Sequence, residues 1–241
     1  MERPTAQDAL TGEELEALLA QIGTRYPTGK RNLAALLLMS DAGLRVGEVC
    51  ALTTKDLVRQ KGSVTHVQIR NGKGGKPGVS PTLTIRAAAA MDRWLGARKA
   101  LGIGSGPVFC TISKGHRDSG FGGDGELVPG KPLSTGYVRA VVKRLRARAG
   151  IEKNVSPHTL RHTFVTRFLR ATGDLERTRK AARHAHISTT AAIYSHLVQQ
   201  DVDEGIDALN AANGDKPDPI AALTAELQAL TAEVAALRGE R

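Results

Sequence analysis

Apolar residues recur three or four positions apart along most of this chain, and this helical spacing constrains the fold more than any other feature of the sequence. The first such run begins at Leu15, behind a capping-box pattern formed by Thr11 and Glu14. One stretch, residues 63–70, alternates instead at the period of two that is typical of a strand. We therefore expect a mainly α-helical protein with a small antiparallel β-sheet, which is an α+β fold.

The helical spacing predicts nine helices in the first 212 residues. They cover about residues 11–22, 30–43, 45–52, 87–101, 135–149, 158–171, 175–183, 189–197 and 201–212. Gly43 is expected to end the second helix in a left-handed conformation. After the strand at 63–70 come a glycine-rich turn and an extended pattern at 79–85, which together predict a β-hairpin with Lys73 near its tip. The glycine-rich and charged stretch 114–131 predicts a mobile loop.

The C-terminal part of the chain predicts a separate element. Residues 213–218 have the composition of a linker, so we expect a domain over 1–212 and an amphipathic helix over 219–241. Apolar residues in this helix step by 3 and 4 over about three heptads, which is typical of a coiled-coil seam. The seam consists of Ile220, Leu223, Leu227, Leu230, Val234 and Leu237. Self-association through the seam and folding back onto the chain's own domain both remain open.

Composition favours a nucleic-acid partner inside the cell. The net charge is +10, which suits a polyanion, and aromatic residues make up only 3% of the chain, which favours a DNA duplex over stacked single strands. There are two cysteines, so a disulfide framework is not expected. The N-terminus lacks an apolar secretory core, and no run is long enough to span a membrane. We expect a cytoplasmic protein.

Four residues with phosphate chemistry stand out. Arg45 and Arg161 can each present a planar guanidinium to two oxygens of one phosphate. Tyr194 offers a phenolic nucleophile, and Lys73 at a hairpin tip can protonate a leaving 5′-oxygen. Each has a plainer interpretation: Tyr194 as a packing residue, Lys73 as part of a solvated turn, and Arg45 as the partner of Glu48 one turn away.

The histidines raise the question of a metal site. His158 and His162 are one helical turn apart, and His184 and His186 are two positions apart, a set that could bind zinc. The set contains no carboxylate or thiolate ligand, and phosphate chemistry accounts for His158 and His184 without a metal. We therefore expect no metal and no cofactor. Packing in the core would explain His162.

Further basic residues are candidates for contacts with the DNA backbone. One is Lys76, beside the expected hairpin tip. The others lie on the helix over 135–149, where a solvated charged face is the alternative interpretation. These helical residues are Arg139, Lys143, Arg144 and Arg146.

Residues 11–196 resemble the catalytic domain of the tyrosine recombinases, the phage-integrase family. The resemblance is carried by four blocks in order: Gly43-Leu-Arg-Val-Gly-Glu-Val-Cys-Ala-Leu52, Gly72-Lys-Gly-Gly-Lys76, Pro157-His-Thr-Leu-Arg-His-Thr163, and His184 with Tyr194. It implies that Arg45 and Arg161 bind the phosphate, that Tyr194 is the nucleophile and that Lys73 is the acid for the leaving group. It also implies that His158 and His184 flank the phosphate for proton transfer and hydrogen bonding, with Glu48 as a supporting acid.

The resemblance implies a site-specific DNA recombinase that works through a 3′-phosphotyrosine, with duplex DNA, further copies of itself and accessory DNA-bending proteins as partners. A type IB topoisomerase-like enzyme and a DNA-binding regulator on the same scaffold are the alternatives. The chain departs from the family pattern at Arg183, where a glycine is usual, and in the longer spacing of ten residues from His184 to Tyr194. The pattern also starts by residue 11, without the family's upstream DNA-clamping domain, so we expect a minimal recombinase or a fragment.

Overall fold

A computed structural model of the chain describes residues 9–71, 76–77, 80–112, 130–184 and 206–210. The chain divides into two compact units, Met1–Tyr194 and Ser195–Arg241. In the second unit the described residues 206–210 are helical, within the helix predicted over 201–212. The predicted helix over 189–197, the loop at 114–129, the linker and the heptad helix lie outside the described residues.

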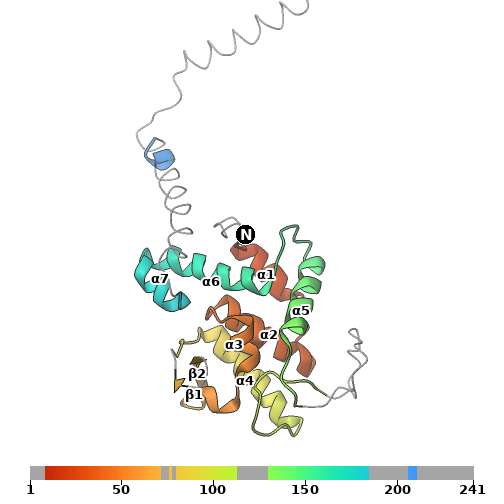
Figure 1. Cartoon of the computed structure of the whole chain (residues 1–241). Coiled ribbons are helices and arrows are strands. Elements are labelled where there is room, and N and C mark those ends of the chain that lie inside the picture. The colour runs from red at the N-terminus through yellow and green to blue at the C-terminus, as the bar shows by residue number, and fades with distance from the viewer. Residues whose placement is uncertain (1–8, 72–75, 78–79, 113–129, 185–205, 211–241) are drawn as a thin grey trace, which may run out of the picture. The chain divides into compact units, whose positions relative to one another are not determined.

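Most of the regular structure described in the first unit is helical (Figure 1). The long predicted helices are confirmed, with ends shifted by a few residues. The observed helices are α1 (Gly12–Ala20), α2 (Pro27–Ser40), α3 (Val46–Ala51), α4 (Ile85–Ala100), α5 (Thr135–Arg148), α6 (Pro157–Thr172) and α7 (Leu175–Ala182), with a 3-10 turn η2 (Thr54–Asp56). The Thr11–Glu14 capping box is also confirmed, because each side chain bonds the other residue's backbone N–H.

The β-structure is small, as expected, but it contains one strand pairing that was not predicted. Strand β1 (Leu57–Gln60), which the sequence pattern did not reveal, pairs with β2 (Ser63–Val67). Lys61 and Gly62 between them both have positive φ, as a two-residue type I′ turn requires. The extended stretch predicted at 79–85 pairs with β2 where it is described, which confirms the expected hairpin. His66 bridges to Thr82, the backbone N–H of Leu83 donates to the carbonyl of Thr65 at 2.8 Å, and that of Val67 donates to the carbonyl of Pro81 at 3.3 Å.

Short strands β3 (Arg70–Asn71) and β4 (Lys76–Pro77) flank the expected hairpin tip. The tip itself, residues 72–75 with Lys73, lies outside the described residues. The extended stretch that pairs with β2 ends at Thr84, whose hydroxyl accepts a hydrogen bond from the backbone N–H of Ala87 and so caps α4.

A continuous apolar core joins the elements of this unit. Helix α2 lies at its centre and packs against α4 on one side and α6 on the other (Figure 1). Trp94 of α4 is fully buried, and its indole N–H donates to the carbonyl of Val108 at 2.9 Å. The core thus fixes α3, which follows α2, relative to α6.

The loop between α2 and α3 is held at two points. The Asp41 carboxylate is buried and accepts hydrogen bonds from Thr84, from Arg86 and from Arg167 of α6. Gly43 has a φ of +64°, which confirms its predicted left-handed conformation, although α2 already ends at Ser40. A Cβ at Gly43 would lie 2.4 Å from the ring of Phe164 on α6. The backbone after α2 can therefore approach α6 closely only because residue 43 has no side chain.

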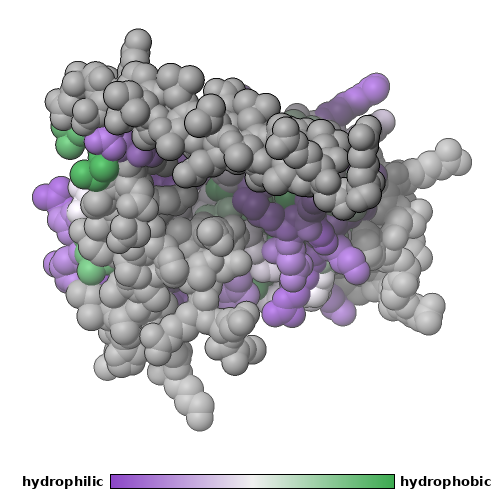
Figure 2. Space-filling model, turned by 90° about the horizontal axis from the view of Figure 1, so that it is seen from above, coloured by the Kyte–Doolittle hydropathy of each residue, from purple (hydrophilic) through white to green (hydrophobic). Residues whose placement is uncertain are grey.

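The described part of the face shown in Figure 2 is mostly polar. Hydrophilic side chains predominate among the described residues visible in Figure 2, and the hydrophobic ones form small, separate patches. The two cysteines are both free and buried. Among the described residues there is no helix that is long and apolar enough to cross a membrane.

Replacing Gly43 with alanine is expected to destabilise the protein strongly. The left-handed backbone costs a non-glycine residue about 1–2 kcal/mol, and crowding the Phe164 ring adds about 1–3 kcal/mol. Gly47 is a matched control, because a Cβ there would meet nothing within 4 Å and alanine favours its helix. Thermal unfolding should show a large drop in melting temperature for Gly43→Ala and none for Gly47→Ala. Equal melting temperatures for the two variants would contradict this packing.

Candidate active site

Arg45 and Glu48 form a tight pair at the start of α3. Arg45 is the residue before the helix, and Glu48 accepts hydrogen bonds from its backbone N–H at 2.7 Å and from its Nη1 at 3.0 Å. The Arg45 side chain is 45% exposed, whereas that of Glu48 is only 18% exposed. The pairing of Arg45 with Glu48, which was the plainer interpretation of Arg45, therefore exists. It leaves the Arg45 guanidinium accessible from solvent.

Arg161 reaches the same place from α6. Its side chain is buried, and its two Nη atoms donate to the backbone carbonyls of Gly43 and Ala182. These acceptors belong to the loop before α3 and to the last residue of α7. Arg161 thus connects three segments that are far apart in the sequence, and no carboxylate contacts it directly among the described residues.

The end of α7 brings Arg183 and His184 beside the two arginines. The backbone N–H of Arg183 donates to the carbonyl of Lys180, and that of His184 donates to the carbonyl of Arg179. This pair of bonds is a Schellman motif, and Arg183 occupies its left-handed position with a φ of +55°. Glycine is the usual residue at such a position, since other residues pay about 1–2 kcal/mol for it.

The Arg183 side chain turns back into the site. Its Nη2 donates to Glu48 at 2.7 Å and to the carbonyl of Gly43 at 2.9 Å, and only 8% of the side chain is exposed. Nη2 of Arg45 in turn donates to the backbone carbonyl of Arg183 at 3.3 Å. Three guanidiniums and one carboxylate therefore meet around the loop at Gly43, an excess of two positive charges.

This excess of cations shifts the pKa of the groups nearby. Burial, together with the charges of Arg45 and Arg183, lowers the pKa of the Arg161 guanidinium to about 9. Burial alone would raise the pKa of Glu48, but hydrogen bonds from Arg45 and the charge of Arg183 outweigh it and lower that pKa. Arg161 and Glu48 are both charged at pH 7, and an added anion would be attracted to the site.

Half-buried His184 experiences the same field. Burial is the main cause, followed by the charges of Arg161, Arg45 and Arg183, and together they lower the pKa of its imidazole to about 4. His184 is consequently neutral at pH 7, so one ring nitrogen can donate a hydrogen bond and the other can accept one.

The remaining predicted site residues divide into two groups. His158 lies on α6 one turn before Arg161 and is exposed, while His162 is buried as expected. Lys73, Tyr194 and His186 lie outside the described residues, and Lys76 is described only through its backbone in β4. The geometry thus places Arg45, Glu48, Arg161 and His184 together and leaves the nucleophile and the acid as predictions.

The basic residues on α5 are not equivalent. Arg139 and Lys143 are exposed one turn apart, as a DNA-facing pair would be. Arg144 is half-buried. Arg146 donates from Nε to the carbonyl of Ile151 at 2.9 Å and from Nη2 to that of Glu152, so it holds the chain that follows α5.

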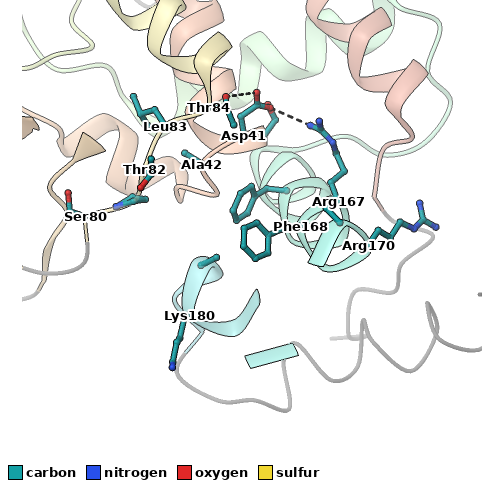
Figure 3. Close-up of a pocket in the computed structure, with 15 residues that line it drawn as sticks. Asp41, Ala42, Ser80, Thr82, Leu83, Thr84, Arg167, Phe168, Arg170 and Lys180 are labelled. Atoms are coloured by element: carbon teal, nitrogen blue, oxygen red, sulfur yellow. Dashed lines mark hydrogen bonds and ion pairs between the residues drawn. The ribbon is translucent and has the colours of Figure 1, made fainter. Parts of the chain in front are cut away.

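A separate pocket of about 960 Å³ lies beyond the Gly43 loop, between α6, α7 and the segment before α4 (Figure 3). Phe168 points into it, and Arg167, which also lines it, reaches Asp41 on its wall. None of the residues that carry the phosphate chemistry lines it. Two of its lining residues, Thr84 and Arg167, bond Asp41 and so hold the loop that carries Gly43.

Two members of the site were not recognised from the sequence. The Gly43 carbonyl, an acceptor for both Arg161 and Arg183, has no signature of its own. Arg183 was noticed only as a departure from a glycine, and that departure was the available signal. In the part of the chain that is described, no group of three or more His, Cys, Asp or Glu side chains could hold a metal ion.

Comparison with known proteins gives consistent matches. The model of the phage integrase family matches residues 8–201. The tyrosine recombinase XerC of Xanthomonas campestris pv. campestris (strain B100) is 34% identical over 193 residues, which are 79% of this chain and 52% of that protein. The tyrosine recombinase XerD of Halalkalibacterium halodurans is 35% identical over 191 residues, 79% of this chain and 58% of that protein. The chain thus spans little more than half the length of these curated relatives.

Solved structures share the fold. The crystal structure of XerA recombinase has a TM-score of 0.64 at 24% identity, covering 85% of this chain and 65% of the other. The post-cleavage complex of XerH site-specific recombinase with a palindromic difH substrate has a TM-score of 0.64 at 24% identity, covering 85% and 53%. These likenesses confirm the mainly helical fold with its small antiparallel sheet.

The field of the three arginines should be measurable at His184. With ¹³C-labelled histidine, the imidazole signal that disappears in His184→Gln should titrate with a midpoint near the pKa of about 4. Because the folded-state pKa lies below the unfolded value of about 6.5, this residue should reduce stability as pH falls from about 6.5 to about 4. His184→Gln should therefore lose less stability than the unaltered protein across that window. A midpoint at or above 6 would contradict the buried cationic surroundings.

Proposed function

The chain belongs to the phage integrase family, the tyrosine recombinases, and we propose that it is a site-specific DNA recombinase that cleaves and rejoins duplex DNA through a 3′-phosphotyrosine. The observation that carries the proposal is the meeting of Arg45, Arg161 and His184 around the Gly43 loop. The site has two positive charges more than negative ones, and Arg45 is open to solvent. Such a site favours an anion with several acceptor oxygens, as a phosphodiester has.

The two arginines suit the transition state of phosphoryl transfer. Charge on the nonbridging oxygens must be neutralised when a fifth oxygen approaches phosphorus, and guanidiniums that are already held in place do this without reorganising. Arg161 is held by two backbone carbonyls and Arg45 by Glu48. Neutral His184 can donate a further hydrogen bond to one of these oxygens.

Tyr194 and Lys73 complete the reaction. The phenolic oxygen of Tyr194 attacks the scissile phosphorus, the bond from phosphorus to the 5′-oxygen breaks, and the 3′-phosphate remains on the tyrosine. Lys73 gives a proton to the departing 5′-oxygen, and exposed His158 takes part in transferring the tyrosine proton. A 5′-hydroxyl of another strand reverses these steps, so the bond energy is kept. The reaction balances without a metal or a nucleotide cofactor.

Duplex DNA is the proposed substrate and partner. Arg139 and Lys143, which are exposed on α5, would contact its backbone together with half-buried Arg144. Lys76, beside the hairpin tip, is a further candidate for such a contact. Arg146 contributes less, because its guanidinium already holds two carbonyls. Self-association on DNA through the heptad helix 219–241, help from accessory DNA-bending proteins and a cytoplasmic location remain part of the proposal.

Recombination is favoured over the other two functions considered. The relatives are named as tyrosine recombinases, and the solved structures as recombinases. A type IB topoisomerase-like activity would use the same chemistry on one duplex, and a DNA-binding regulator would need no cleavage. A regulator would gain nothing from two arginines and a neutral histidine held in place around one anion site.

Tyr194→Phe is expected to abolish the covalent adduct while leaving duplex binding nearly unchanged, because one hydroxyl is lost and the cationic surface remains. Adducts would be detected as denaturant-resistant protein–DNA bands after incubation with nicked duplexes that carry candidate sites. Tyr26→Phe is the control, since Tyr26 is exposed and belongs to the start of α2. An adduct formed by Tyr194→Phe would show that another residue is the nucleophile.

Lys73→Ala and Arg161→Ala are expected to differ on a substrate whose 5′-bridging oxygen is replaced by sulfur. A thiolate leaves without a proton, so the sulfur should largely restore cleavage by Lys73→Ala. Arg161→Ala should stay slow by about a hundredfold or more on both substrates, because the nonbridging oxygens need neutralising in either case. Single-turnover cleavage rates measure both effects. Equal defects of Lys73→Ala on the two substrates would exclude Lys73 as the acid.

A further inference from the structure

Arg183 occupies a backbone position that does not favour arginine. It is the left-handed residue that ends α7, and among the described non-glycine residues only Lys61 shares a positive φ. Lys61 lies exposed in a tight turn. The Arg183 side chain is instead buried, with its Nε lacking a hydrogen-bond partner among the described residues. Strain and burial both oppose arginine here, so its contacts must compensate for them.

Those contacts connect both phosphate-binding arginines. Nη2 of Arg183 donates to Oε2 of Glu48, whose Oε1 accepts from Arg45. The same Nη2 donates to the carbonyl of Gly43, which also accepts from Arg161. Arg183 thus bonds directly to Glu48, the partner of Arg45, and to the Gly43 carbonyl, a partner of Arg161.

The contact with Glu48 determines how Arg45 is used. A carboxylate can accept two parallel hydrogen bonds from one guanidinium. If Glu48 bound Arg45 in this way, two nitrogens of Arg45 would be unavailable to a phosphate. Because Arg183 and the Arg45 backbone N–H occupy Oε2, Arg45 reaches only Oε1, through Nη1. Its second Nη makes only a long bond of 3.3 Å to the Arg183 carbonyl. Glu48 therefore orients Arg45 through one side-chain nitrogen and leaves its other nitrogens available for a phosphate.

We propose that Arg183 is a positioning residue for DNA cleavage: it holds Glu48 and the Gly43 carbonyl so that Arg45 and Arg161 stay aligned on one phosphate. The inference rests on the proposed function, because alignment matters only if a phosphate reacts there. Arg183 does not itself contact the phosphate, since its side chain is 8% exposed whereas that of Arg45 is 45% exposed. It acts from behind the two arginines.

Arg183→Gly tests this directly, because glycine suits the left-handed backbone and removes only the side chain. Its melting temperature should stay within about 5 °C of the unaltered protein, as relief of strain offsets the lost ion pair. The affinity for an intact duplex should change by less than about threefold, since a buried cation neutralises no DNA phosphate. Single-turnover cleavage of a nicked duplex should fall by about tenfold to a hundredfold, the range known for residues that orient the ligands of a metal.

Three further variants separate positioning from other roles. Arg183→Lys should recover part of the rate, because an ammonium keeps the charge beside Glu48. Adding Glu48→Gln to Arg183→Gly should slow cleavage no further than the worse single variant, within about twofold, if Arg183 acts through Glu48. Arg177→Ala, on the exposed side of α7, should cleave as the unaltered protein does.

The outcomes are distinct. An Arg183→Gly protein that cleaves within twofold of the unaltered rate, or a double variant whose defects multiply, would overturn the positioning role while leaving the recombinase proposal intact. If the unaltered protein forms no adduct with any nicked duplex on which it is tried, the proposed function fails and this inference fails with it.

Discussion

The backbone carbonyl of Gly43 is the point on which the candidate site depends. It accepts hydrogen bonds from Arg161 of α6 and from Arg183 at the end of α7, and the loop that carries it leads directly into Arg45 and α3. The carbonyl can be there only because residue 43 is a glycine in the left-handed conformation, packed against Phe164. One small residue therefore brings three distant segments together.

The fold places more positive than negative charge around this carbonyl. Glu48 is the one carboxylate that contacts these arginines among the described residues, and two guanidiniums share it. Burying cations without an equal number of anions is costly, and the lowered pKa values of Arg161 and His184 express that cost. A bound phosphate would bring negative charge to these guanidiniums and offset part of that cost.

Sequence patterns predicted what depends on local spacing. The helices α1, α4, α5, α6 and α7 follow apolar periodicity and clear caps, and they were placed within a few residues. Strand β1 was missed because Leu57 to Gln60 is mostly exposed and does not alternate. The stretch before α4 does alternate, and its predicted pairing with the strand at 63–70 was found. The motif residues Arg45, Glu48, Arg161 and His184 were identified by their order in the chain. The partners of Arg183 could not be, since they lie more than 130 positions away in the sequence.

The most direct test of the central claim is to identify the atom that carries the DNA after cleavage. The unaltered protein would be trapped on a nicked duplex carrying a candidate site, digested with nuclease and protease, and the modified peptide sequenced by mass spectrometry. A nucleotide joined through its 3′-phosphate to Tyr194, with a free 5′-hydroxyl on the released strand, is the predicted result. A linkage through a 5′-phosphate, or to any other residue, would contradict the account.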